Sequence, residues 1–178
     1  TLAEEYGGRA AGSDADARAA IWVVETFQRQ GLETHIDTFT ATLSKRDVAL
    51  QNVWAIAPGA ASGTIVIVAN RDSPPGSTQG ADANASGTAA LLELARVFAV
   101  TGHEHTLVFL STDGDAYGAL GARRFVDQRG TDDIIAVIAI AVIIITVVVS
   151  IGLFIAFVVG IGIFIALTGA GAFILAFI

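Results

Sequence analysis

Four aspartates could place several carboxylates around one cleft. Asp72 follows one short apolar run of the chain, Asp113 and Asp115 follow the next, and Asp82 lies between them. Because carboxylate oxygens are the ligands that Ca²⁺ and Mg²⁺ prefer, a divalent-cation site is one interpretation of this spacing. The alternative is that Asp82 and Asp113 cap turns, a common use of aspartate, and we favour that interpretation.

A second pair of candidate ligands is formed by His103 and His105, whose spacing puts two imidazoles on one side of an extended segment. The pair follows Gly102, between an expected helix and an expected strand, on the edge away from the aspartate-bearing loops. We therefore predict a solvated loop rather than a metal site. The chain has no cysteine, so it has neither a thiolate metal site nor a disulfide framework.

The periodicity of the apolar residues predicts the elements that position these side chains. Ser13 is expected to begin an amphipathic helix and Gly31 to end it. A second helix is predicted over 85–100, and a third is predicted to begin within 118–125. Strands are predicted over 32–39, 48–57, 63–69, 106–111 and 134–140, and the last three are expected to be buried.

Strands alternate with helices along most of the chain, which indicates an α/β fold with a mostly parallel, twisted sheet between helices. In such sheets ligands bind at the carboxyl ends of the strands. The loops after Ala69 and Ser111 are therefore expected to carry the site.

The charge distribution divides the chain into two parts. All 10 Lys and Arg and all 17 Asp and Glu lie between Glu4 and Asp133, with a formal net charge of −7. The acidic part has no cluster of basic residues to meet phosphates, which argues against a nucleic-acid partner. We predict an acidic soluble domain over 1–133, with its last strand running to about 142.

Residues 134–178 contain no charged side chain. A membrane-spanning helix needs about 20 apolar residues, so this segment predicts one or two transmembrane helices, or a buried strand followed by one such helix. Gly152, Ala156 and Gly160 have the spacing that lets helices approach closely in lipid. The expected partners are membrane lipid and other membrane-protein subunits, with the acidic domain outside the cytoplasm.

Six short motifs link the chain to a known family. They are 8–13 (GRAAGS), 51–53 (QNV), 70–73 (NRDS), 80–87 (GADANASG), 91–96 (LLELAR) and 118–122 (GALGA). Over roughly residues 7–142 their order and spacing resemble those of the co-catalytic di-zinc aminopeptidases, peptidase family M twenty-eight of clan MH. The resemblance implies a zinc-aminopeptidase-like fold. In the family this domain continues well past the point where the chain turns apolar, so we expect a truncated fold.

The resemblance also implies where metal ligands would stand. The family's first ligand is a His after the first site strand, and Asn70 occupies its position, while the Asp that bridges both metals is replaced by Ala83. After the next strand the family has two glutamates, a general base and a ligand, and Asp115 and Ala116 stand there. The family's fourth ligand, an aspartate, falls on Ala141.

Two supporting carboxylates of the family are retained or conservatively replaced. Asp72 stands where the family orients its zinc-binding His, and Asp115 stands where it has its base. Zinc sites use roughly three or four N, O or S donors, and the former ligand positions offer only the amide oxygen of Asn70. Because the family's base acts on metal-bound water, Asp115 would have nothing to activate. We therefore expect no catalytic residue, metal ligand or cofactor; the alternative is zinc in an atypical site.

The retained polar residues are candidates for a binding cleft that could take a peptide. Arg71 would meet an anionic group there, although we favour a surface salt bridge for it. Residues 84–86 match a glycosylation sequon, but they are better explained as the cap of the following helix. The candidate cleft residues are Asn70, Arg71, Asp72, Asp82, Asn84 and Asp115.

Three functions remain for such a chain. The first is a membrane-anchored, zinc-free relative of the aminopeptidases that acts as a binding or structural subunit. The second is an active metallo-aminopeptidase that releases N-terminal residues through an atypical metal site. The third, an accessory domain of a transporter or channel, is not supported, since no ionisable residue in the apolar segment marks a pathway. The missing ligands favour the first.

Overall fold

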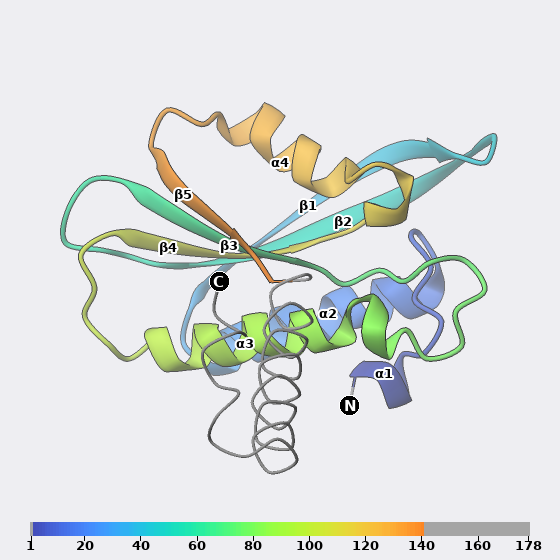
Figure 1. Ribbon diagram of the computed structural model, residues 1–178, viewed down its shortest axis with the longest axis horizontal. Coiled ribbons are helices and arrows are strands. Elements are labelled where there is room, and N and C mark those ends of the chain that lie inside the picture. Colours follow the sequence, from blue (N-terminus) through green and yellow to red (C-terminus); the bar gives the residue numbers. More distant parts are fainter. Residues whose placement is uncertain (1, 141–178) are drawn as a thin grey trace, which may run out of the picture. The chain divides into compact units, whose positions relative to one another are not determined.

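The computed structural model of the protein describes residues 2–140, apart from the side chains of Asp82 and Ala83. These residues form a five-stranded sheet in the order β1-β2-β4-β3-β5, with helices on both faces (Figure 1). The expected α/β class is therefore confirmed. The strands are β1 (Glu33–Leu43), β2 (Arg46–Ala57), β3 (Thr64–Asn70), β4 (Thr106–Thr112) and β5 (Ile134–Ala139). The helices are α1 (Leu2–Glu5), α2 (Asp14–Arg29), α3 (Ser86–Phe98) and α4 (Leu120–Arg129), with a π-helical turn at Ala81–Ala85 and a 3₁₀ turn at Asp115–Tyr117.

Helix α2 begins and ends where its sequence predicts. The Ser13 hydroxyl oxygen accepts a hydrogen bond from the N–H of Asp16 (3.2 Å), which caps the first turn. After the last turn Gly31 has a φ of 78°, a left-handed conformation that glycine adopts without steric cost. The local sequence is sufficient to set both ends of this helix.

Two apolar layers hold the helices to the sheet. Helices α2 and α3 cover one face, where Phe27, Leu91 and Phe109 are buried in the larger core (Figure 1). Helix α4 covers the other face, where Phe125 packs with Leu110. Each such side chain contributes about 1.5–3 kcal/mol when fully buried, so these layers are the main support of the fold.

The sheet is mixed, so the prediction of a mostly parallel sheet was wrong in this respect. Ser44 and Lys45 have φ values of 49° and 68°, and Leu43 pairs directly with Arg46. A two-residue turn with this backbone joins antiparallel strands, because its twist matches theirs. Strand β2 also runs antiparallel to β4. Within the described sheet, the parallel pairs are β4 with β3 and β3 with β5.

Strands β3 and β4 run parallel and side by side, as predicted for the strands that carry the site. Their register pairs Asn70 with Thr112 at the carboxyl ends. Helix α3 lies between the two strands in the chain and packs against both. The loops after β3 and β4 therefore leave from the same edge of the sheet, where ligand sites form in folds of this class.

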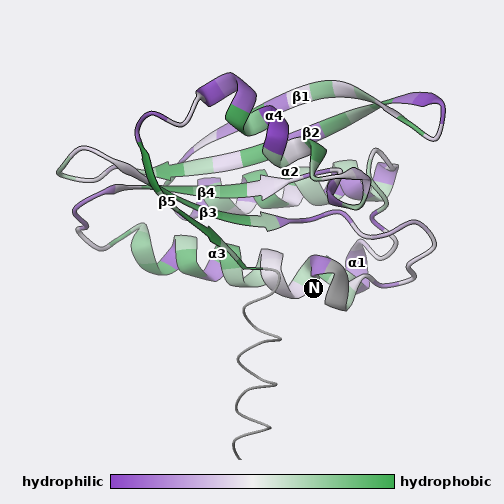
Figure 2. Cartoon of the chain, turned by 45° about the horizontal axis from the view of Figure 1, so that its top comes forward, coloured by the Kyte–Doolittle hydropathy of each residue, from purple (hydrophilic) through white to green (hydrophobic). Residues whose placement is uncertain are grey.

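Strand β5 was predicted to be buried, but most of it is exposed. It lies at the edge of the described sheet, beside β3, and Figure 2 shows it as hydrophobic along its length. Ile135 and Val137 are 57% and 62% exposed. The physical reason is its position, because the main helix–strand contacts of the described residues are made with β1, β2, β3 and β4 and not with β5.

The predicted transmembrane helices concern residues outside the described range. Residues 134–139 belong to β5, and residues 141–178 are not described. Among residues 2–140, no helix is both long and apolar enough to cross a bilayer. The division into a soluble domain over 1–133 and a membrane segment over 134–178 thus stays a prediction.

Candidate functional site

Three segments meet at the carboxyl ends of β3 and β4. The loop after β3 joins the loop after β4 through a hydrogen bond from the Asp115 N–H to Asp72 Oδ2 (3.0 Å). It joins the start of α3 through a hydrogen bond from Asn84 Nδ2 to Asn70 Oδ1 (3.0 Å). Four of the six candidate cleft residues therefore lie close together. We call Asn70, Asp72, Asn84 and the N–H of Asp115 the amide network.

The Asn70 amide is engaged on both its oxygen and its nitrogen. While its oxygen accepts from Asn84, its nitrogen donates to the carbonyl oxygen of Asp72 (3.1 Å) and, at 3.4 Å, to Asp72 Oδ1. Asn84 is buried, and its Oδ1 accepts the N–H of Gly87 (3.1 Å). This hydrogen bond satisfies a backbone N–H in the first turn of α3, although the N-cap residue is Ala85, which makes no side-chain cap.

Asp72 is the link between the two site loops. Its side chain is buried, although it belongs to a loop. Burial raises the pKa of Asp72 above its ordinary value, and the hydrogen bond from the Asp115 N–H opposes this effect. Asp115 itself is exposed, so its carboxyl group is open to solvent.

The donor set does not fit the zinc that the resemblance implies. Alanine has no donor atom, which removes Ala83 and Ala116 as ligands in any geometry, and Ala141 lies outside the described residues. The remaining oxygen, Asn70 Oδ1, already accepts a hydrogen bond from Asn84. Among the described side chains of residues 2–140, which leave out Asp82, no three His, Cys, Asp or Glu side chains are grouped so that they could hold a metal ion. The Ca²⁺ or Mg²⁺ interpretation stays a prediction, because it includes Asp82, whose side chain is not described.

Arg71 lies in the interior, so the favoured surface salt bridge was wrong. Its side chain is completely buried, and Nε and Nη2 donate to the two carboxylate oxygens of Asp16 at 3.0 and 3.1 Å. Nη2 also donates to the Gln51 carbonyl (2.7 Å) and lies 3.3 Å from Asp113 Oδ2. The reason is the alternation of side chains in an extended segment, since Arg71 follows Ala69 onto the face that α2 covers.

Asp113 does not cap its own turn, so that interpretation was wrong as well. Its Oδ2 accepts the N–H of Gln51 (3.0 Å), which lies on the neighbouring strand β2. The side chain is only 1% exposed. Burial and then the negative charge of Asp16 raise the pKa of Asp113 to about 8, although Arg71 opposes the shift. For Asp82, whose side chain is not described, turn capping stays a prediction.

Arg9 is a structural residue that the sequence analysis missed. Its buried guanidinium donates to the carbonyl oxygens of Arg71 and Gly80, both at 2.9 Å, and also to that of Gln79 (3.1 Å). Burial lowers the pKa of Arg9, against the opposing charges of Asp16 and Asp72. These contacts hold both ends of the segment between β3 and the π-helical turn. The sequence signal for this role is the motif at 8–13, which contains Arg9.

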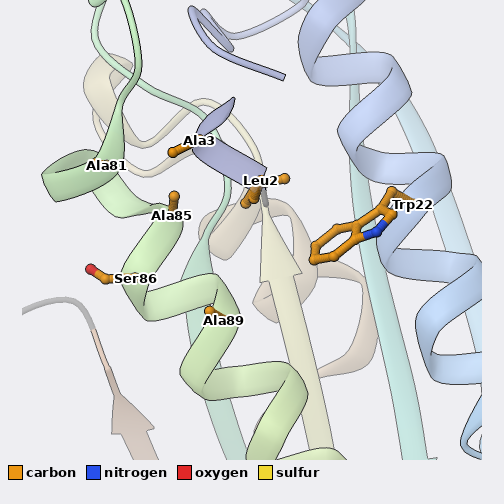
Figure 3. A pocket seen from close by; sticks show the side chains of 7 residues that line it. All are labelled: Leu2, Ala3, Trp22, Ala81, Ala85, Ser86 and Ala89. Carbon is orange, nitrogen blue, oxygen red and sulfur yellow. The ribbon is translucent and has the colours of Figure 1, made fainter. Parts of the chain in front are cut away.

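An apolar pocket lies apart from the amide network, between α1, α2 and the start of α3 (Figure 3). Its volume is about 390 Å³, within the range of small-molecule sites. None of its lining residues is ionisable, so the chemistry-bearing groups do not open into it. The lining residues are Leu2, Ala3, Trp22, Ala81, Ala85, Ser86 and Ala89.

The two loop histidines lie between α3 and β4, as predicted. His103 Nδ1 is 3.0 Å from the carbonyl oxygen of His105, and His105 Nδ1 is 2.9 Å from that of Ser62. Both rings are thus occupied with backbone groups. In the described part of the chain they belong to no group of side chains that could hold a metal ion.

The fold is that of the zinc aminopeptidases and glutaminyl cyclases. The aminopeptidase from Aneurinibacillus sp. strain AM-1 has a TM-score of 0.70 at 12% identity, covering 78% of this chain and 67% of that one. BSAP, a zinc aminopeptidase from Bacillus subtilis, has a TM-score of 0.64 at 14% identity over 71% of this chain and 62% of its own. Porphyromonas gingivalis glutaminyl cyclase has a TM-score of 0.64 at 23% identity, over 78% of this chain and 54% of its own. At these identities the likeness establishes the fold alone.

The family follows from the sequence itself. A profile of Peptidase family M28 matches residues 52–146, more than half of the 178 residues. The chain belongs to this family, which confirms the resemblance carried by the six motifs. The "Alkaline phosphatase isozyme conversion protein" of Escherichia coli (strain K12) is 29% identical over 149 residues, 71% of this chain and 43% of that protein. The chain thus spans less than half the length of this curated relative.

Proposed function

We propose that the protein is a membrane-anchored member of the peptidase family that does not bind zinc and serves as a binding or structural subunit. The observation that carries this proposal is the hydrogen bond between Asn70 Oδ1 and Asn84 Nδ2. It occupies the one donor oxygen at the former ligand positions within the described residues. Hydrolysis in the family depends on metal-bound water, for which these side chains provide no holder.

A peptide is the ligand class that best suits the cleft. The amide network joins the two site loops to each other and to the segment that begins α3, which supports a binding surface at this edge of the sheet. The exposed carboxyl group of Asp115 can accept hydrogen bonds from a ligand amine. The cleft would then hold a peptide by polar contacts and release it uncleaved.

Membrane anchoring is supported by the uncharged run over 134–178. Because residues 134–139 form β5, we place the anchor after residue 140. The remaining apolar residues are numerous enough for one span of about 20 residues. Anchoring would put the acidic domain outside the cytoplasm, next to lipid and other membrane-protein subunits.

An active zinc aminopeptidase is the second candidate, and family membership is the observation in its favour. The retained Asp72 and the acidic residue Asp115 stand where the family has its orienting and basic groups. This function requires a metal site built from other residues. The experiment below separates the two candidates.

The first experiment measures zinc content of the purified full chain together with hydrolysis of an aminoacyl anilide, with and without added Zn²⁺. We expect no stoichiometric zinc and no chelator-sensitive turnover. A matched variant, Asn70→His with Ala83→Asp and Ala116→Glu, returns the family's ligand types to three positions. It should bind zinc more tightly than the parent chain, because three donors replace one engaged amide.

Stoichiometric zinc with chelator-sensitive turnover in the parent chain would contradict the proposal and support the aminopeptidase. Zinc binding by the variant alone would show that the scaffold is competent and that the side chains are what it lacks. The anchor is tested separately by flotation of the full chain with lipid vesicles. Recovery of the chain in the soluble fraction after alkaline carbonate extraction would refute the anchor without touching the zinc proposal.

A further inference from the structure

Five charged side chains are buried among the described side chains of residues 2–140, which do not include Asp82, and their charges do not balance. Arg9 and Arg71 supply two positive charges, whereas Asp16, Asp72 and Asp113 supply three negative ones. An uncompensated charge in the interior is unfavourable, so the cluster is more stable when one carboxyl group is protonated. The charge count alone therefore points to a proton held in the folded chain.

The geometry places this proton between Asp16 and Asp113. Asp16 takes both Nε and Nη2 of Arg71, at 3.0 and 3.1 Å, whereas Asp113 meets Nη2 at 3.3 Å. One guanidinium thus faces two carboxyl groups, and Asp113 Oδ1 is buried without a hydrogen-bond partner among the described residues. Two carboxylates that share one site do not both ionise readily.

The three residues come from three different segments. Asp16 lies in the first turn of α2, Arg71 lies in the loop after β3, and Asp113 lies in the loop after β4. From β2, the backbone N–H of Gln51 also faces Asp113. The other charged groups of the cluster are Arg9, from the N-terminal segment, and Asp72, which both feel the charge of Asp16.

Arg71 also stands between Asn70 and Asp72 in the chain. A shift of its backbone therefore moves the two residues on which the amide network depends. This continuity connects the buried charges to the candidate site without any further element.

We propose that Asp16, Arg71 and Asp113 form a latch that holds one proton between its two carboxyl groups, and that loss of this proton in alkaline solution loosens the loops of the candidate site. The latch is independent of whether the chain is a peptidase. It is a pH-sensitive device made from residues whose side chains lie inside the fold.

The direction of the pH effect follows from the proton balance. The pKa of Asp113 is raised from an ordinary 3.8 to about 8, so between these values the folded chain binds the proton and the unfolded chain does not. The stability that the proton contributes is complete below about pH 4, falls as the pH rises, and is lost above about pH 8. Across this window one proton changes the unfolding equilibrium constant about tenfold per pH unit.

The test is urea unfolding of the full chain between pH 5 and pH 9, compared with Asp113→Asn. The amide keeps an acceptor for the Gln51 N–H and resembles the protonated carboxyl group, but it does not titrate. In the parent chain the unfolding equilibrium constant should rise about tenfold per pH unit because of this proton. We expect the variant to lack this part of the pH dependence. It should therefore be more stable than the parent chain at pH 9.

Two further variants make the result specific. Asp132→Asn removes the same charge from an exposed position and should keep the parent's pH dependence. Asp16→Asn removes the other carboxylate from Arg71 and should also flatten the profile, because Asp113 would then ionise beside an unshared guanidinium. This second variant keeps the proposal testable if Asp113→Asn does not fold.

Hydrogen exchange gives a local readout of the same device. Corrected for intrinsic exchange, the amides of residues 71–73 and of Asp115 should exchange faster at pH 9 than at pH 6 in the parent chain. In Asp113→Asn this difference should disappear. Parallel pH profiles in the parent chain and in both latch variants, by unfolding or by exchange, would overturn the proposal.

Discussion

The two sides of the loop after β3 are built from different kinds of interaction. On one side the amide network joins Asn70, Asp72 and Asn84 by hydrogen bonds at 3.0–3.4 Å, close to the exposed Asp115. On the other side the latch pairs Arg71 with two carboxyl groups, all almost completely out of solvent. The loop therefore has a buried ion-pair cluster on one side and, on the other, two amide side chains that are hydrogen-bonded to each other and to Asp72.

This difference indicates which interactions hold the site loops in place. A buried ion pair stabilises the fold only when both partners are present, because removal of one leaves the other charge buried and unpaired. Amide hydrogen bonds contribute less each, and their loss affects mainly the groups that they join. We therefore expect the latch to determine whether the loops form, and the amide network to determine how they are shaped.

The largest effect is expected from Arg71→Met, which breaks the latch. The variant leaves Asp16 and Asp113 buried without their common cation, so unfolding should cost about 3–5 kcal/mol less than in the parent chain. Chemical denaturation at pH 7 measures this. The control is Arg18→Met, which replaces an exposed arginine on α2. It should change stability by less than about 0.5 kcal/mol. If both variants lost little stability and to the same extent, the latch would not differ from the amide network in the way proposed.

A smaller effect is expected from Gly87→Ala, which distorts the amide network. A methyl group there would press on the Asn84 side chain, whose Cγ lies 2.6 Å from the new carbon position. We expect a loss of about 1–3 kcal/mol, the usual cost of such overpacking. Gly102→Ala is the matched control, because nothing lies within 4 Å of its added carbon. If Gly87→Ala had the stability of the parent chain, the backbone at the start of α3 would be able to shift and accommodate the methyl group without cost.

Asn84→Ala removes hydrogen bonds rather than adding volume. It deletes the acceptor of the Gly87 N–H and the donor to Asn70, which should cost about 1–2 kcal/mol in thermal or chemical unfolding. Ser86→Ala, two residues away and exposed, should have almost no effect. If Asn84→Ala were as harmful as Arg71→Met, the amide network would support the fold to the same degree as the latch.

The smallest effect is expected at an ion pair on the surface. Glu93 and Arg96 lie 2.6 Å apart on α3, with about 60% of each side chain exposed. Because water and salt screen such a pair, Arg96→Ala should leave the unfolding midpoint unchanged within error. A clear loss of stability in Arg96→Ala would contradict our inference that exposed ion pairs contribute much less to the stability of this chain than buried ones.

Much of the fold could be predicted from local patterns, since the five strands and the helices α2, α3 and α4 follow from residues within them, whereas α1 was not predicted. Strand direction could not, because it depends on the two-residue turn at Ser44 and Lys45 and on which strands become neighbours. The exposure of β5 was also not predicted, because an apolar run has the same sequence pattern at the edge of a sheet as in its middle.

In the site, the motifs brought Asn70, Asp72 and Asn84 to the right place, because they belong to short segments at strand and helix ends. The burial of Arg71 was missed, since its partner Asp16 is 55 residues away in the sequence. The role of Arg9 was missed for the same reason, as it holds carbonyl groups 62 and 71 residues away.

The sequence by itself determined the order of the elements, the family, and the lack of ligand atoms at Ala83 and Ala116, because donor atoms belong to the residue type in any fold. The tertiary structure decided which charges are buried and with whom they pair. That decision rests on the docking of α2 against β1 and β2, which brings Asp16 beside the loops after β3 and β4 and so into one desolvated cluster with Arg71 and Asp113. The charge state of this cluster depends on all three residues together, so it cannot be inferred from any one of them in the sequence.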